Sequence, residues 1–515
     1  MTKEPTMTRS GENGVALVIT LMMVAVVSVL GTTLMFTSQS ETWSSANYRM
    51  AGQARYAAES GVHHAANFLL NPALYAPPDA ATLPDYNLNV SPITVAATGE
   101  EVVLSSDPGV PGDWPASANA AATAFAAFAK GAMAANSAQV TYSTSAKLLT
   151  MHRFQEPYSA NFKTIQTWEI TSAGIIPGPR SVRVEVSAIV GQYMIPLFRY
   201  AAFATNPGCA ALNFGGGATT NSYDSGDPSF DPTAPAFSNT GANVGTNGNL
   251  TGVGATTIIN GSLSTPRSGV GTCAAGAVTA ASLNNATVTG GLIEMSQQQE
   301  YPTPVVPADP LWASQNMQKT TPCNFGAGAP PAANATCTPI AGTGPRLTPT
   351  GADPVLLGDV TVSGGATLTL QAGTYVVNTL QFSGNSSIKT FGDGPVTIYV
   401  AGKDPMNPCA TCWVPNPVKF TGGSITNESL DPLDFTIVYA GPEAISLKGG
   451  STAAALIYAP NAAATFVGNG DFYGSVISNR VLDTGGVDFH YDRNLQRYRS
   501  TASSPMLSSF TWKSF

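Results

Sequence analysis

Carboxylate, imidazole and guanidinium side chains gather near the end of the chain, and their types could perform acid–base chemistry. They are Asp471, Asp483, Asp488, His490, Asp492 and Arg493. Paired carboxylates are the groups that cleave glycosidic bonds, so these residues could form an active site on one face of a β-structure. Acidic residues in solvated turns and at the cap of a fold give the same composition. Because paired acids are few elsewhere, we predict no catalytic residues, and a membrane-anchored enzyme acting on polysaccharide is the alternative.

A second group of polar residues offers oxygen ligands for a hard cation. It consists of Asn221, Asp224, Asp227 and Asp231. Carboxylate and amide oxygens are the ligands that Ca²⁺ prefers, but the EF-hand spacing and its closing Glu are missing. Asx-turns explain the same residues. We therefore predict no cofactor and no metal, with Ca²⁺ as the alternative.

Six cysteines lie beyond residue 200, and this even number suits an oxidising compartment. The spacing of Cys409 and Cys412 is typical of redox pairs, which sit at a helix N-terminus. Pro408 before them and the prolines after them exclude a regular helix, so we expect a loop disulfide. A second local pair, Cys323 with Cys337, is also expected. All six are candidates for disulfides: Cys209, Cys273, Cys323, Cys337, Cys409 and Cys412.

Two adjacent histidines, His63 and His64, are poor metal ligands because neighbouring helical residues point in different directions. We interpret them as surface or partner-facing residues. The sequence contains no Walker-type loop, dinucleotide fingerprint or serine nucleophile elbow.

The composition favours a large β-rich extracellular protein. The chain has 515 residues, of which only 10% are charged, while 51 are Gly and 38 are Pro. Soluble cytosolic enzymes carry about 25% charged residues. The net charge is −8 and no Lys/Arg stripe is present, so nucleic acid is not expected as the main ligand.

Short strands separated by Gly and Asn fill the region after about residue 201. Examples are 359–363, 396–400, 435–439 and 454–458. Glycines recur at steps of 18 to 20 residues, as in Gly364, Gly384 and Gly402 and again in Gly450, Gly468 and Gly486. A period near 20 with several short strands per repeat predicts a β-solenoid, specifically a parallel β-helix. A β-sandwich is the alternative.

An uncharged run from Val15 to Phe36 predicts a membrane span. As a helix it measures roughly 33 Å, enough for a hydrocarbon core of about 30 Å. The helical pattern continues without proline to Asn71, and Pro72 stops it. One rod of roughly 85 Å, apolar first and amphipathic later, suits side-by-side packing in a filament.

Residues of the second half of this rod recur at spacings of three and four and share one face. Most are small, so a neighbouring helix could approach closely. The predicted assembly face comprises Met50, Ala54, Ala57, Glu59 and Gly61.

These features resemble the PilX-type minor pilins of type IV pili. The resemblance rests on a short polar leader ending in Gly14, the uncharged helix, Arg49-Met-Ala-Gly52 and Ala57-Ala-Glu-Ser-Gly61. It implies that a prepilin peptidase cuts after Gly14 and that Val15 becomes the methylated first residue. Major pilins carry Glu at the fifth mature position, which is Ile19 here, so the resemblance favours a minor, tip-proximal or priming subunit.

The resemblance also implies partners and a location. Expected partners are other minor and major pilins, the prepilin peptidase, inner-membrane lipid and a surface or carbohydrate ligand. The expected location is the bacterial inner membrane, with a single pass and an extracytoplasmic C-terminus, and later a pilus, a type II secretion pseudopilus or the cell surface. The segments 459–462, 468–475 and 489–492 resemble the closing part of large PilX-associated C-terminal domains. A passive anchored envelope protein, which would keep an intact leader, is the remaining alternative.

The predicted fold is therefore α+β and mostly β. The expected segments are 1–14 (leader), 15–71 (pilin-like helix), 72–138 (Pro/Ala-rich with a short helix), 139–200 (antiparallel strand unit), 201–497 (β-solenoid) and 498–515 (tail).

Overall fold

The computed structural model describes most of the chain as two compact units. The described residues are 12–135, 138–178, 181–252, 257–266, 287–308, 317–318, 337–339, 345–347, 354–365, 367–404, 409, 411–448, 453–503 and 505–514. The first unit comprises Met1–His152, Thr164–Gln192 and Pro505–Phe515, and the second comprises Arg153–Lys163 and Tyr193–Ser504.

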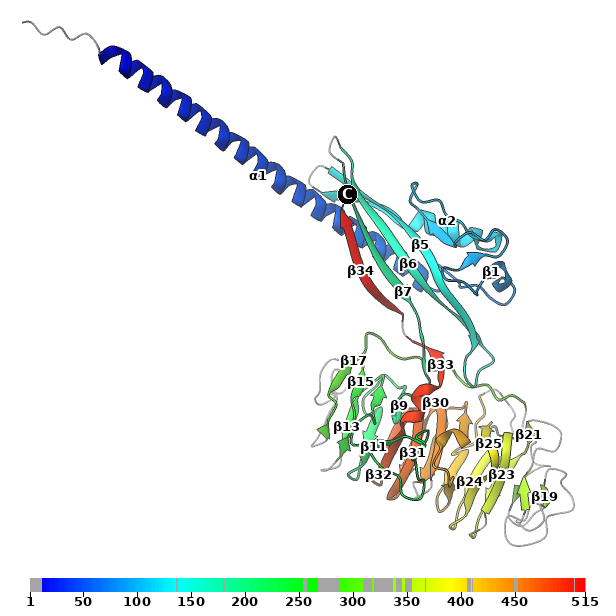
Figure 1. Cartoon of the computed structure of the whole chain (residues 1–515). Coiled ribbons are helices and arrows are strands. Elements are labelled where there is room, and N and C mark those ends of the chain that lie inside the picture. Colours follow the sequence, from blue (N-terminus) through cyan, green and yellow to red (C-terminus); the bar gives the residue numbers. More distant parts are fainter. Residues whose placement is uncertain are drawn as a thin grey trace, which may run out of the picture. The chain divides into compact units, whose positions relative to one another are not determined.

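The first unit begins with one unbroken helix, α1 (Glu12–Leu70), which Figure 1 shows as a straight rod. The helix ends two residues before Pro72, whose ring and missing N–H prevent its continuation. The predicted continuous helix is confirmed. A shorter helix, α2 (Asn119–Phe128), forms in the alanine-rich stretch where one was expected.

An antiparallel sheet completes the first unit. Its order is β3–β5–β6–β7–β34, and β4 also pairs with β5. The strands are β3 (Val103–Ser105), β4 (Lys130–Ala135), β5 (Ala138–Gln155), β6 (Phe162–Ile176), β7 (Val182–Gly191) and β34 (Met506–Ser514). β34 joins this sheet from beyond the second unit, so the chain leaves after β7 and returns. The first unit also contains small elements outside this sheet. They are the antiparallel pair β1 (Tyr86–Asn87) and β2 (Thr94–Val95) and the 3₁₀ turns η1 (Leu83–Asp85) and η2 (Ala116–Ala118).

The second unit consists mainly of one sheet of short strands whose ladders are parallel, except for the antiparallel β19–β20 pair. Its early strands are β9 (Ala202–Ala204), β10 (Leu212–Phe214), β11 (Thr219–Tyr223), β12 (Val244–Thr246), β13 (Leu250–Gly252), β14 (Ile258–Ile259), β15 (Leu263–Thr265), β16 (Thr287–Val288), β17 (Leu292–Glu294), β18 (Met317–Gln318), β19 (Cys337–Pro339), β20 (Pro345–Leu347) and β21 (Val355–Leu356).

The later strands of the same sheet include its longest members, β23, β25, β30 and β31. In chain order, the later strands are β22 (Asp359–Val362), β23 (Thr367–Val377), β24 (Thr379–Phe382), β25 (Ser387–Val400), β26 (Val418–Phe420), β27 (Ser424–Thr426), β28 (Phe435–Tyr439), β29 (Ile445–Lys448), β30 (Ala454–Val467), β31 (Gly470–Asp483) and β32 (Val487–Asp492). Two 3₁₀ turns, η4 (Pro432–Asp434) and η5 (Arg493–Arg497), follow strands β27 and β32. A separate antiparallel pair joins β8 (Met194–Pro196) to β33 (Arg499–Ala502).

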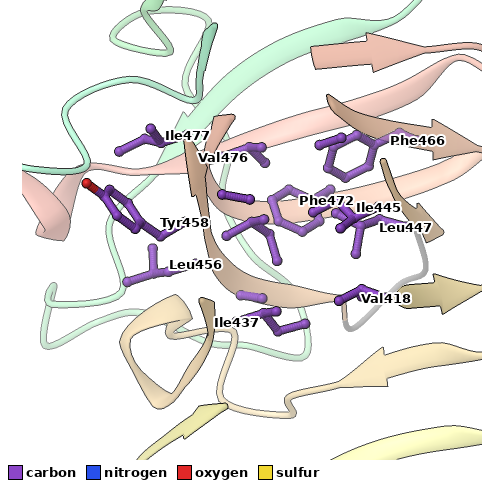
Figure 2. Packing of buried hydrophobic residues seen from close by; sticks show 14 of the residues in the cluster. Val418, Ile437, Ile445, Leu447, Leu456, Tyr458, Phe466, Phe472, Val476 and Ile477 are labelled. Atoms are coloured by element: carbon purple, nitrogen blue, oxygen red, sulfur yellow. The ribbon is translucent and has the colours of Figure 1, made fainter. Parts of the chain in front are cut away.

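Parallel register stacks like residues above one another in this unit. In the ladder from β25 through β28 to β30, Ile398 pairs with Ile437 and Ile437 with Ile457. All three side chains are buried. Figure 2 shows the same core, with Ile437, Leu456 and Val476 among its labelled residues. Phe382 and Phe420 stack with ring centroids 4.8 Å apart. A long helix combined with a mostly β chain is therefore confirmed.

Candidate functional site

Between Val15 and Phe36, α1 presents uncharged and mostly apolar side chains to its surroundings. Val15, Ile19 and Phe36 are 61%, 54% and 72% exposed. The helix is long and apolar enough to cross a membrane, which agrees with an anchoring segment. An apolar stripe of this size needs lipid or other helices around it.

Hydroxyl groups in this apolar half form hydrogen bonds within the helix. Thr20 Oγ1 donates to the carbonyl of Ala16 at 2.9 Å, and Thr32 Oγ1 donates to that of Ser28 at 2.8 Å. A hydroxyl with a partner costs much less to transfer into hydrocarbon than one without. These threonines are therefore compatible with a lipid-embedded helix.

The second half of α1 packs against the sheet of its own unit. Ala54 and Ala57 are fully buried. A Cβ atom at Gly174 of β6 would overlap the carbonyl oxygen of Ala54, so only glycine allows this close approach. Similarly, a Cβ atom at Gly61 would overlap Ser172 Oγ.

The small residues of the predicted assembly face therefore pack against the chain's own sheet and not against a neighbouring helix. Ala54, Ala57 and Gly61 were expected to admit a neighbouring helix, and the structure instead places strands of the same chain against them. Met50 is partly buried in the same cluster. Glu59 lies on the flank and accepts a hydrogen bond from Arg55 Nε at 2.8 Å. A role of these residues in assembly remains a prediction.

The two histidines of α1 make aromatic contacts. His64 lies 5.7 Å from both Phe128 and Tyr142, measured between ring centroids, and His63 lies 6.3 Å from Phe510. Both imidazoles are exposed.

Two of the C-terminal acids hold turns together. Asp483 Oδ1 accepts hydrogen bonds from the backbone N–H groups of Gly485 and Gly486, each at 3.1 Å. Asp492 Oδ1 caps η5 by accepting from Asn494 N at 3.0 Å, and it also accepts from Ser225 N. Burial raises the pKa of both carboxyls above its usual value. Their donors are backbone groups and neighbouring side chains, which is a structural arrangement.

His490 is enclosed by aromatic rings. Its ring lies 4.3 Å from that of Phe237 and 4.6 Å from that of Tyr473. Its nitrogens contact Asp471 Oδ1 at 3.0 Å and Asn221 Oδ1. Burial lowers the pKa of His490 below its ordinary value, against the opposing effect of Asp471.

The remaining members of the acidic cluster also have local partners. Asp488 Oδ1 accepts from the backbone N–H of Thr219 at 2.6 Å, and Arg493 Nε donates to the carbonyl of Tyr223 at 3.4 Å.

The candidate calcium ligands form turns. Asp227 accepts from the backbone N–H of Ser229, and Asp231 accepts from that of Thr233, each at 2.9 Å. Asp224 forms an ion pair with Arg497 at 3.1 Å. Within the described ranges, no group of three or more His, Cys, Asp or Glu side chains is placed to hold a metal ion.

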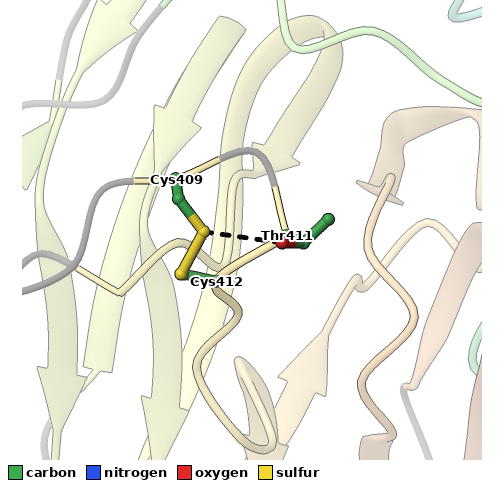
Figure 3. Close-up of a disulfide and its surroundings, with 3 residues drawn as sticks. All are labelled: Cys409, Thr411 and Cys412. Atoms are coloured by element: carbon green, nitrogen blue, oxygen red, sulfur yellow. Dashed lines mark hydrogen bonds between the residues drawn. A yellow bond between two sulfur atoms is a disulfide. The ribbon is translucent and has the colours of Figure 1, made fainter.

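The loop disulfide between Cys409 and Cys412 is confirmed (Figure 3), with their Cα atoms 5.1 Å apart. Cys209 is also disulfide-bonded. Cys273 and Cys323 lie outside the described residues, as does the side chain of Cys337.

A hollow of about 610 Å³ in the second unit was not predicted from the sequence. It is lined by residues 155–160, at the end of β5 and in the turn after it, and by residues scattered from Leu197 to Ser500. No local spacing connects these residues. The one local signal is the segment Gln155-Glu-Pro-Tyr158, a proline-containing turn between two alternating strands.

Two family models match the chain. Residues 13–63 match the PilX N-terminal family, and residues 355–498 match a domain of unknown function (DUF7305). No curated protein matches. Among solved structures, the competence-associated pilin ComZ from Thermus thermophilus matches with 14% identity and a TM-score of 0.24, covering 90% of this chain and 98% of that chain. A TM-score this low does not establish a common fold.

The helix and the family match together indicate the class: the N-terminal segment is similar to that of pilin-like proteins. More particularly, the chain is PilX-like over residues 13–63 and carries a large, β-rich C-terminal domain. The resemblance predicted from the sequence is therefore confirmed, and it supports a structural or assembly role.

Proposed function

We propose that this chain is a minor pilin, or pseudopilin, of a type IV pilus or a related type II secretion apparatus. The observation that carries the proposal is the division of α1. Its first half is apolar and exposed, as a segment packed first in lipid and then among other helices must be. Its second half packs against the antiparallel sheet of the same chain and buries Ala54 and Ala57 there.

The proposed position is at or near the filament tip. A bulk subunit would use a Glu at the fifth mature position to neutralise the N-terminal amine of a neighbour. Ile19 cannot do so, and its side chain is exposed on the helix. A subunit at the tip has no neighbour above it, so it does not need a Glu side chain to neutralise that neighbour's N-terminal amine.

The second unit is proposed to be a β-solenoid. Parallel ladders support this, because strands β22, β24 and β26 pair successively, as do β23, β25, β28, β30 and β31. Sandwich sheets are instead antiparallel. We propose the segment boundaries 1–14 (leader), 15–71 (helix), 72–138 (Pro/Ala-rich segment with a short helix), 139–200 (strand unit), 201–497 (solenoid) and 498–515 (C-terminal tail). Strand β34 of the tail pairs with β7 of the strand unit.

In this proposal the β-rich domain faces outwards from the membrane. It contacts other minor pilins or a surface ligand, including carbohydrate. The leader is removed after Gly14, Val15 is methylated, and the helix passes from the inner membrane into the filament. The PilX match over residues 13–63 supports this route, because it spans the proposed cleavage position.

The test is the intact mass of the protein purified from membranes, with and without the host prepilin peptidase. A mass that matches a chain starting at Val15 plus one methyl group, found only with the peptidase, is expected. A control strain with Gly14→Val should retain the full-length mass. The same full-length mass in both peptidase backgrounds would refute the proposal and leave an anchored β-rich envelope protein.

A further inference from the structure

The hollow in the second unit has the dimensions and floor of a small-ligand site. Ligand pockets usually measure about 300 to 1,000 Å³ and are mostly apolar, and this one measures about 610 Å³. Its floor consists of buried side chains that are each at most 6% exposed: Leu197, Phe198, Leu456 and Leu495.

Tyrosine rings form much of the wall. Tyr158, Tyr399 and Tyr498 line the hollow, and the ring of Tyr158 lies 6.4 Å from those of Tyr399 and Phe198. Burial raises the pKa of Tyr158 and Tyr399, so their hydroxyls stay protonated. Part of the lining therefore consists of neutral aromatic rings, and the faces of such rings carry partial negative charge.

Tyr158 occupies a strained backbone position. Its φ is +57°, in the left-handed region that bulky residues rarely adopt. The turn is held by Ser159 N donating to the carbonyl of Glu156 at 3.1 Å and by Val305 N donating to that of Tyr158 at 2.7 Å. Glycine would form this turn without strain, so a tyrosine at this position carries a conformational cost. Strain of this kind concentrates at ligand-binding positions.

Glu156 supplies the only formal charge among the residues that line the hollow. The lining includes no Lys, Arg or His. Among the described residues, Glu156 forms no ion pair within 4 Å, although its charge acts on nearby Tyr458. A carboxylate beside low-dielectric walls concentrates negative potential in the concavity.

We propose that this hollow binds a small organic cation, namely an ammonium group carried on an apolar body. Aromatic faces and a carboxylate attract the cationic group, and the leucine floor accepts the apolar body. An anion would be repelled by Glu156. The proposal depends only on the second unit and is independent of the pilin assignment.

The test is calorimetric titration of the full chain in lipid nanodiscs, with empty nanodiscs as the blank. The probe is benzyltrimethylammonium, and its controls are neutral benzyl alcohol and anionic benzenesulfonate. The cation is expected to bind about tenfold more tightly than the alcohol, and the sulfonate is expected not to bind. Equal binding of cation and alcohol, or no cation binding at concentrations on the order of 10 mM, would overturn the proposal.

Three variants and a matched control locate the effect. Glu156→Gln and Tyr399→Leu should each weaken cation binding by about tenfold, while Tyr399→Phe, which keeps the ring, should bind like the parent chain. Glu428→Gln makes the same chemical change at an exposed residue outside the hollow and should have no effect. Thermal unfolding of each variant verifies its fold. Unchanged affinity in folded Glu156→Gln or Tyr399→Leu would contradict the proposal.

Discussion

The two halves of α1 are continuous in backbone and opposite in environment. Residues such as Val26 in the first half are 58% exposed, whereas Ala57 in the second half is fully buried by strands of its own chain. One helix thus contains a segment stabilised by intramolecular packing and a segment that needs an external apolar environment. The comparison separates substitutions that change folding from those that change insertion or assembly.

The largest effect is expected from a charge in the exposed half. Val26→Asp should raise the free energy of membrane insertion by about 3 kcal/mol, because Asp is poorly tolerated at the centre of a span. The unfolding of the first unit should not change. Membrane fractionation and thermal unfolding measure the two quantities.

Tyr56→Asp is the matched control, since Tyr56 is 67% exposed but lies in the second half. It should leave membrane partitioning unchanged. Loss of membrane association in this variant would mean that the division between the two halves is misplaced.

A smaller effect is expected from a methyl group at the contact between helix and sheet. Gly174→Ala should reduce the free energy of unfolding of the first unit by about 2 kcal/mol, because the added carbon overlaps the backbone of Ala54. Chemical denaturation measures the loss.

Gly178→Ala supplies the control, because a Cβ atom there meets nothing within 4 Å. Equal stability of the Gly174 and Gly178 variants would show that the helix does not pack as closely on β6 as the structure indicates.

A substitution on the exposed flank of the second half of α1 should change the free energy of unfolding only slightly. Arg55→Ala removes an ion pair with Glu59 and the contact of its guanidinium with Trp512, which lies 5.2 Å from the ring centroid. Because Arg55 is 46% exposed, the loss should be at most about 1 kcal/mol in the free energy of unfolding. A loss of several kcal/mol, measured by the same denaturation, would place this flank in the core.

The smallest effect is expected from a hydroxyl in the exposed half. Thr32→Val removes a group that already bonds to the helix backbone, so membrane partitioning should change by less than about 0.5 kcal/mol. A marked change in filament incorporation, measured by immunoblotting of sheared filaments, would show that Thr32 contacts another subunit.

Local patterns were sufficient for the elements that depend on nearby residues. The absence of proline up to Pro72 predicted a helix that in fact ends at Leu70, and the short β-branched and aromatic run 435–439 predicted β28 at its observed bounds. Helix and strand periodicity are properties of adjacent residues, so a sequence reports them directly.

Long-range partners could not be obtained in the same way. Small size at Ala54 and Gly61 indicated close approach of another element, but not whether it would be a helix or β6. The hollow presents the same difficulty, because Glu156 follows β5 and Tyr399 lies in β25, and no local pattern indicates that these distant residues line one hollow. From the sequence alone, Asp483 and Asp492 were candidates for acid–base chemistry. The structure shows that both carboxylates accept hydrogen bonds from backbone N–H groups in turns, which is a structural arrangement.

The return of β34 to the first sheet has a consequence for biosynthesis. β7 precedes the second unit and β34 follows it, yet they are neighbours in one sheet. During translation the edge of β7 therefore remains unpaired until the entire second unit and β34 have been synthesised. A nascent or prematurely terminated chain would expose that edge to chaperones and proteases. Completion of the sheet could thus distinguish finished subunits from incomplete ones before assembly begins.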